Sequence, residues 1–205
     1  DLYFTSNQLP AGAAINLSLE HSSLSYVLNG GLPSYIEAQD YTVHGDIIID
    51  AANSSTIEAG TKFLFDGPYK FTIEGQINVA GTYADSVYFI NKDPNVSEGN
   101  KWLGIFMDGE NSSSSSINYA KMSGVQWNEA LDPFEDFYGF TMNINLSHPS
   151  LNNLFIDNSA KGIRLDESNP TLDNVHIFHC TQGLLMSKES KPTISNSKFN
   201  YNTED

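Results

Sequence analysis

The sequence predicts an all-β solenoid, in which short strands wind into coils that stack on one another. Three observations support this prediction. A proline-apolar-asparagine phrase repeats near the C-terminal end, turn residues separate short alternating strands elsewhere, and no long stretch has helical apolar spacing. The 205 residues are 40% hydrophobic, which is enough to bury a core. We therefore expect a stack of strands with little helix.

The repeated phrase occurs as PSLNNLFI from residue 149, PTLDNVHI from residue 170 and PTISNSKF from residue 192, at spacings of 21 and 22 residues. In each copy an apolar residue is followed two positions later by Asn153, Asn174 or Asn196, and the apolar series then resumes out of step. Asparagine tolerates the left-handed backbone of a sharp bend. The phrase thus predicts strand, bend and strand, with the three asparagines stacked as a structural ladder. An earlier copy at residues 116–122 has Tyr119 in place of the asparagine.

A coil of about 22 residues cannot bury its own apolar face, so like coils stack at roughly 4.8 Å and bury each other's. Residues 41–205 are expected to form this stack, because strands and glycine turns also alternate from residue 42 to residue 81. Residues 1–40 are expected to be an N-terminal cap or the tail of a preceding domain. A long loop interrupts the stack at about residues 126–147. The stack is expected to be truncated at its C-terminal end, with further domains in the same polypeptide.

Three further stretches carry a family resemblance: TIEAGTKFLF at 56–65, FTIEGQINVAGT at 71–82, and KWLGI at 101–105 followed by a serine run and the asparagine-bend coils. They resemble right-handed parallel β-helix proteins of the pectate-lyase-like superfamily, especially the non-catalytic β-helix regions of large bacterial secreted or cell-surface proteins. Ala59 departs from that pattern, which usually has proline there. The resemblance implies a right-handed parallel β-helix with coils of about 21–22 residues and one inserted loop. It also implies that some relatives cleave polysaccharides.

The charge balance limits the partners. Ten basic residues against 25 acidic ones give a net charge of −15, so the chain lacks the clustered cations with which proteins bind nucleic acids. The negative net charge also repels polyuronates and anionic lipids unless a bound cation lies between them. The apolar runs are too short to cross a bilayer. A single cysteine excludes an internal disulfide. We expect an extracellular or cell-surface location, with a polysaccharide or another surface protein as partner.

The sequence favours a non-catalytic role over an enzyme. A uronate lyase needs a basic catalytic residue, and the one arginine, Arg164, is expected to be solvated. A glycoside hydrolase needs two suitably separated carboxylates, for which the inserted loop offers Asp132, Glu135 and Asp136. Solvated loop acids are common in so acidic a chain, so catalysis remains the alternative.

Metal sites are not expected. The only histidine and cysteine group, His176, His179 and Cys180, predicts two surface histidines beside a buried thiol, because metal ligation needs three or four converging groups. Calcium is a weak suggestion: Asp46, Asp50 and Asp66 offer carboxylates without a spaced Asp-x-Asp-x-Asp loop. No cofactor is predicted.

The inserted loop carries the candidate ligand-binding residues, which are the aromatic side chains Trp127, Phe134, Phe137 and Tyr138. Aromatic rings stack on sugars or anchor a protein partner. The alternative is that these rings cover an apolar flank of the solenoid, because leaving them in water is costly. The sequence therefore predicts a structural or adhesive module of a larger protein, favours the covering role for these rings, and leaves glycan binding as the other role open to them.

Overall fold

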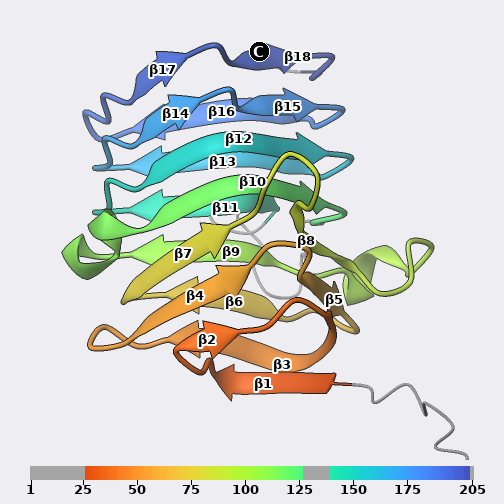
Figure 1. Ribbon diagram of the computed structural model, residues 1–205. Coiled ribbons are helices and arrows are strands. Elements are labelled where there is room, and N and C mark those ends of the chain that lie inside the picture. Colours follow the sequence, from red (N-terminus) through yellow and green to blue (C-terminus); the bar gives the residue numbers. More distant parts are fainter. Residues whose placement is uncertain (1–25, 127–138, 204–205) are drawn as a thin grey trace, which may run out of the picture.

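The computed structural model describes residues 26–126 and 139–203, which form one sheet of 18 strands. All strand pairs in these ranges are parallel. The strands lie above one another, from β1 and β2 at one end to β17 and β18 at the other (Figure 1). The predicted all-β class is confirmed. The described ranges contain two short 3-10 helices, η1 (Glu98–Asn100) and η2 (Glu110–Ser114), and no helix able to cross a membrane.

The strands pair in three ladders, each built by successive passes of the chain. The first ladder contains β2 (Tyr35–Ile36), β4 (Ser54–Glu58), β7 (Gln76–Ala80), the first halves of β10 (Ser116–Ser123) and β12 (Ser150–Asp157), β14 (Thr171–Asp173) and β17 (Thr193–Ser195). The second contains the first parts of β1 (Tyr26–Gly31) and β3 (Asp40–Ile49), β5 (Lys62–Phe65), β8 (Val87–Asn91), the second halves of β10 and β12, β15 (His176–Phe178) and β18 (Lys198–Asn200). The third contains the ends of β1 and β3, β6 (Lys70–Ile73), β9 (Gly104–Asp108), β11 (Phe140–Asn145), β13 (Lys161–Asp166) and β16 (Gln182–Ser187).

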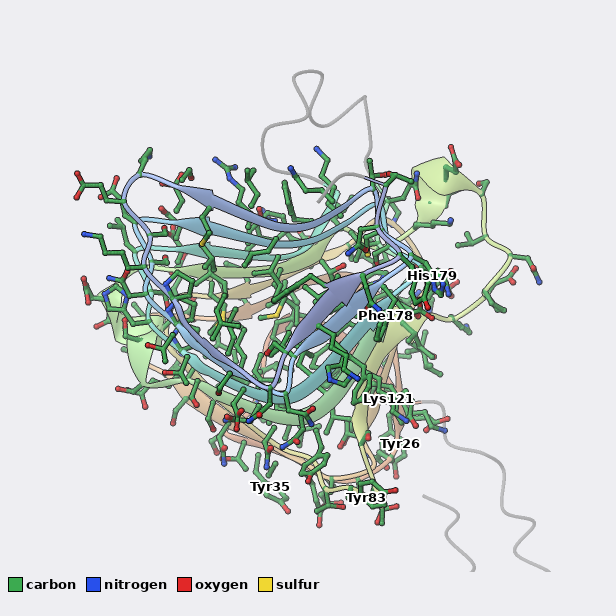
Figure 2. The ribbon with its side chains drawn as sticks, turned by 90° about the horizontal axis from the view of Figure 1, so that it is seen from above. Tyr26, Tyr35, Tyr83, Lys121, Phe178 and His179 are labelled. Carbon is green, nitrogen blue, oxygen red and sulfur yellow. The ribbon has the colours of Figure 1, made fainter. Side chains whose placement is uncertain are left out.

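The length of each pass varies along the stack. Side chains bonded between neighbouring passes near the C-terminal end are 21 or 22 residues apart, at Asn174 and Asn153 and at Ser195 and Asp173. In the middle of the stack the separation grows to 38 residues at Ser116 and Asn78, because connecting segments lengthen each pass. Viewed from above, the passes overlie one another around a common interior (Figure 2). This arrangement is compatible with a solenoid.

The sheet includes two regions that the sequence did not assign to it. Strands β1 and β2 pair with β3 and β4, so the stack begins by residue 26 rather than at residue 41. Residues 140–145, expected within the inserted loop, form β11 between β9 and β13. Both regions lack the asparagine-bend phrase from which the coils were predicted, and pairing with neighbouring passes determines their structure.

The core is a narrow interior filled by one side of the strands from β2 to β15. Alternate residues point inward because side chains alternate across a strand. In the second ladder Phe63 packs between Tyr41 and Phe89, with ring centroids 6.1 and 4.9 Å away. Phe65 stacks on the fully buried Trp102 at 4.5 Å. Stacked aromatic rings from successive passes therefore contribute much of the buried area.

The asparagine corner lies between the first and second ladders. Asn153, Asn174 and Asn196 have φ values of 52°, 54° and 51°, and Tyr119 has 48° at the equivalent bend. The Asn174 amide donates to Asn153 Oδ1 at 2.7 Å, and the Asn153 amide donates to Asn118 Oδ1 at 2.9 Å. Asn118, which precedes the tyrosine, thus joins the row of amides.

Asn196 departs from the expected ladder, because its amide donates to Asp173 Oδ1 at 2.7 Å rather than to Asn174. Hydrogen bonds from Ser195 and Asn196 lower the pKa of Asp173. The carboxylate is a stronger acceptor than an amide oxygen. The last described pass therefore joins the stack through a charge-assisted contact.

Removing the Asn153 side chain should destabilise this corner. We expect Asn153→Ala to lower the free energy of unfolding by about 2 kcal/mol, because a left-handed alanine is strained and two amide hydrogen bonds are lost. Asn153→Gly should cost only about 1 kcal/mol, since glycine adopts the bend without strain. Urea denaturation followed by circular dichroism measures both. Asn152→Ala is the control, because within the described ranges the Asn152 side chain donates its hydrogen bond to Ser150 on its own strand. Equal losses for alanine and glycine would contradict the strain argument.

Serine hydroxyls accept backbone hydrogen bonds at or next to the corners of the stack, including the asparagine corner. The hydroxyls of Ser115, Ser159 and Ser168 accept hydrogen bonds from backbone N–H groups of the preceding pass, those of Ile77, Val125 and Ser147. The pattern continues where Ser168 N donates to Ser190 and Val175 N to Ser197. Buried backbone N–H groups that are not bonded within a strand ladder need another partner. The serine-rich composition is thus explained in part by corner chemistry.

Candidate functional site

A groove of about 550 Å³ lies over β6, β9, β11 and β13, on the outer face of the third ladder, and is also lined by Lys188, which follows β16. The inward residues of β11 are Met142 and Ile144, so Asn143 faces the opposite side. Asn143 is in register with Phe106 of β9 and Arg164 of β13, and all three line the groove. We call this hollow the Asn143 groove.

Asn143 is the unusual residue of the groove. Its relative exposure is 7%, and within the described ranges neither Oδ1 nor Nδ2 has a hydrogen-bond partner. A buried polar group without a partner costs about 1–3 kcal/mol. A ligand with both a donor and an acceptor would remove that cost. Asn143 therefore makes the groove a candidate binding site.

Charged side chains surround the amide. Asp166 Oδ2 lies 3.3 Å from Arg164 Nη2, and Asp166 Oδ1 lies 3.3 Å from Lys188 Nζ. The Asp166 and Arg164 side chains are only 9% and 14% exposed. The expectation that Arg164 is solvated is therefore wrong: it faces outward, but the groove walls and its carboxylate partner cover it. Ion pairs this well covered are screened less by salt than surface pairs.

The groove is electrically balanced, unlike the chain as a whole. Among the described lining residues three are basic and three acidic: Lys70, Arg164, Lys188, Glu74, Asp108 and Asp166. The Asp108 carboxylate already accepts from Asn145 Nδ2 at 2.7 Å. Neither a strongly anionic nor a strongly cationic ligand is favoured by such a lining. A neutral polar molecule fits it best.

Most residues proposed from the sequence as binding or catalytic groups lie outside the described residues. These are Trp127, Phe134, Phe137, Tyr138, Asp132, Glu135 and Asp136. The neighbouring Phe140 is described: it is buried at the start of β11, with Lys161 Nζ 5.1 Å from its ring centroid. Phe140 therefore belongs to the scaffold rather than to an exposed aromatic cluster.

No protein-family model matches the chain, and no curated protein or solved structure matches it either.

The histidine and cysteine group lies near a different corner. His179 is exposed, with Nδ1 2.7 Å from Asp157 Oδ1, and His176 is half-buried on β15. Cys180 is buried, and burial raises the pKa of its thiol. A raised pKa keeps the thiol protonated and poorly nucleophilic at neutral pH. In residues 26–126 and 139–203, no three His, Cys, Asp or Glu side chains are placed to hold a metal ion.

Two of the three aspartates suggested for calcium have other partners. Asp46 accepts a hydrogen bond from the backbone N–H of Lys70, and Asp66 pairs with Lys92 Nζ at 3.0 Å. These contacts hold the two carboxylates on the surface of the stack.

Sequence analysis missed Asn143 because residues 126–147 were interpreted as a loop. One signal was present: in the segment TMNIN, Met142 and Ile144 alternate with polar residues, as in a half-buried strand. That alternation was enough to place Asn143 on an outward face. It did not indicate that neighbouring passes would bury the side chain.

Proposed function

We propose that the chain winds into a right-handed parallel β-helix and acts as a non-catalytic module of a larger secreted or cell-surface protein, binding a neutral glycan in the Asn143 groove. The parallel ladders and the separations of 21 or 22 residues support the winding. The resemblance to β-helix regions of bacterial surface proteins supports the setting. The unpartnered, buried Asn143 amide is the observation that carries the binding proposal.

The chemistry of Asn143 favours hydroxyl groups as ligands. Its side chain presents one acceptor and two donor hydrogens, and a hydroxyl both donates and accepts. Phe106 adds an aromatic surface on the neighbouring strand, which can pack on the apolar face of a sugar ring. A neutral sugar also suits a lining in which basic and acidic residues balance.

A polysaccharide-cleaving enzyme is the second candidate, because Glu74, Asp108 and Asp166 line the same groove. A glycoside hydrolase needs one carboxyl to give a proton and another to act as base or nucleophile. Asp166 is instead paired with two cations, and Asp108 with an amide. These pairings favour binding over catalysis. Asp132, Glu135 and Asp136 remain the catalytic residues of the alternative.

Asn143→Ala tests the binding proposal. We expect binding to be weakened about tenfold, whereas the free energy of unfolding should stay unchanged or rise by about 1 kcal/mol, because an unsatisfied amide is removed. The probes are cello-, xylo-, laminari- and mannohexaose, measured by isothermal titration calorimetry against the whole chain. Asn152→Ala on the first ladder is the matched control and should bind as the parent does.

Each outcome of this test has a distinct meaning. Unchanged affinity in Asn143→Ala, or no binding of any hexaose by the parent, would overturn the glycan site and leave a spacer. Stability reduced by more than about 1 kcal/mol would show that the amide has a structural partner. Release of reducing sugar, lost in Glu135→Gln or Asp136→Asn, would establish the enzyme instead.

A further inference from the structure

Aromatic side chains follow one another along the outer face of the second ladder, on a different side of the stack from the Asn143 groove. Tyr88, Lys121, Phe155 and His176 are in register on β8, β10, β12 and β15. Phe178 stands two residues after His176 on the same outward side. We call this surface the Phe155 face; Lys121, Phe178 and His179 are labelled on it in Figure 2.

The rings of this face contact one another and stay accessible. The Phe155 and His176 ring centroids are 4.9 Å apart at an interplanar angle of 75°, and those of His176 and Phe178 are 5.8 Å apart at 78°. Phe155 is 37% exposed. A groove of about 460 Å³ runs over the face between Tyr88 and His179. The edge-to-face contacts fix the rings in place, so little side-chain entropy is lost when a ligand binds.

Polar groups border the rings. Asp157 Oδ1 lies 2.7 Å from His179 Nδ1 on one side. On the other, Lys121 Nζ lies 3.4 Å from the Tyr88 hydroxyl and 5.3 Å from the centroid of its ring. The face therefore combines an apolar centre with donors and acceptors at its border.

This pattern fits a pyranose ring, which has an apolar C–H face and hydroxyls around its edge. An added peptide strand is disfavoured, because β10 and β12 are each already paired on both sides and offer no free edge. A polyanion is disfavoured by the net charge of −15. We propose that the Phe155 face is a second carbohydrate-binding surface, independent of the Asn143 groove, on which sugar rings stack over Phe155 and Phe178.

The bound glycan would lie across the strands. Phe155 and Phe178 come from neighbouring passes, and neighbouring strands are about 4.8 Å apart. Phe178 also lies two residues further along its strand than the register partner of Phe155, so a sugar chain that contacts both rings must cross the strands obliquely. Two glycan surfaces on different sides of one module would allow the protein to cross-link polysaccharide chains.

The test uses Phe155→Ala and Tyr83→Ala as a matched pair. Tyr83 is a 90% exposed aromatic residue away from this face (Figure 2), so its removal controls for the loss of an aromatic side chain. The probes are the same four neutral hexaoses, titrated into the whole chain while the ring-proton resonances of Phe155 and Phe178 are followed by NMR. We expect these resonances to shift, and the affinity at this face to fall about tenfold in Phe155→Ala.

The result is separable from that for the Asn143 groove. Asn143→Ala should leave the ring shifts intact, and Phe155→Ala should leave binding in the groove intact. No ring shift with any hexaose, or equal shifts of Phe178 in the parent and in Phe155→Ala, would overturn the second surface while leaving the first untouched. Circular dichroism of Phe155→Ala verifies that the fold is retained.

Discussion

Gly162→Ala is expected to lower the free energy of unfolding by at least about 3 kcal/mol, since the added methyl group cannot be accommodated without moving backbone. A Cβ at this position would overlap the carbonyl oxygen of Gly183 in the neighbouring pass and crowd Ile177 Cγ2 at 2.8 Å. A flexible side chain can rotate away from such a contact, but a carbonyl in a strand ladder moves only with its strand. Urea denaturation followed by circular dichroism gives the measurement.

Gly31→Ala is the control for this substitution. Gly31 is also a strand glycine, at the end of β1, and a Cβ there would meet nothing within 4 Å. Its replacement should change the free energy of unfolding by less than about 0.5 kcal/mol, or raise it slightly through the unfolded state. Similar effects at the two glycines would show that the passes are not packed as closely as described.

Phe63→Ala is expected to cost about 3–5 kcal/mol, the range for deleting a buried phenylalanine. Phe63 is fully buried, stacks between Tyr41 and Phe89, and meets Phe71 edge-on with centroids 5.6 Å apart. Its removal leaves a cavity shared by three passes of the chain. Thermal and urea unfolding measure the loss.

Phe63→Leu separates shape from hydrophobicity. Leucine keeps most of the apolar volume and loses the ring stacking, so a loss of roughly 1–2 kcal/mol is expected. A loss as large as that of alanine would mean that ring stacking dominates. A negligible loss for alanine would contradict the buried position of Phe63.

The C-terminal passes could be predicted because their sequence is constrained locally. A left-handed bend at Asn153, Asn174 and Asn196 restricts the residue type, so the same letter recurs at a regular spacing. Elsewhere the left-handed corners tolerate unrelated residues, including Leu146, Glu167 and His179. These corners therefore leave no sequence signal. Strands β1, β2 and β11 also lack the asparagine-bend phrase, so their sequences did not mark them as further copies.

The candidate sites were harder to predict than the fold. Asn143 and Arg164 are ordinary outward residues of strands, and their burial arises only when β9, β11, β13 and β16 lie side by side. The Phe155 face has the same origin: Tyr88 and Phe155 are 67 positions apart in sequence but separated by a single strand. The aromatic cluster at 127–140 was favoured because its residues are close together along the chain. Residues of different passes that become neighbours cannot be recognised as such from the sequence alone.

The corner serines have a consequence for how such a chain changes length. The Ser168 hydroxyl accepts a hydrogen bond from the backbone amide of Ser147, and the Ser190 hydroxyl accepts one from the backbone amide of Ser168. Each of these serines therefore satisfies an amide of the preceding pass, and the amide of Ser168 is in turn satisfied by the pass that follows it. Duplicating or deleting one complete turn preserves this succession of hydrogen bonds. The steps from Ser147 to Ser168 and from Ser168 to Ser190 are 21 and 22 residues, so a turn can also gain one residue without losing them. The stack is thus expected to lengthen by whole turns, and tandem duplication of one turn is the mutation that lengthens it at least cost in stability.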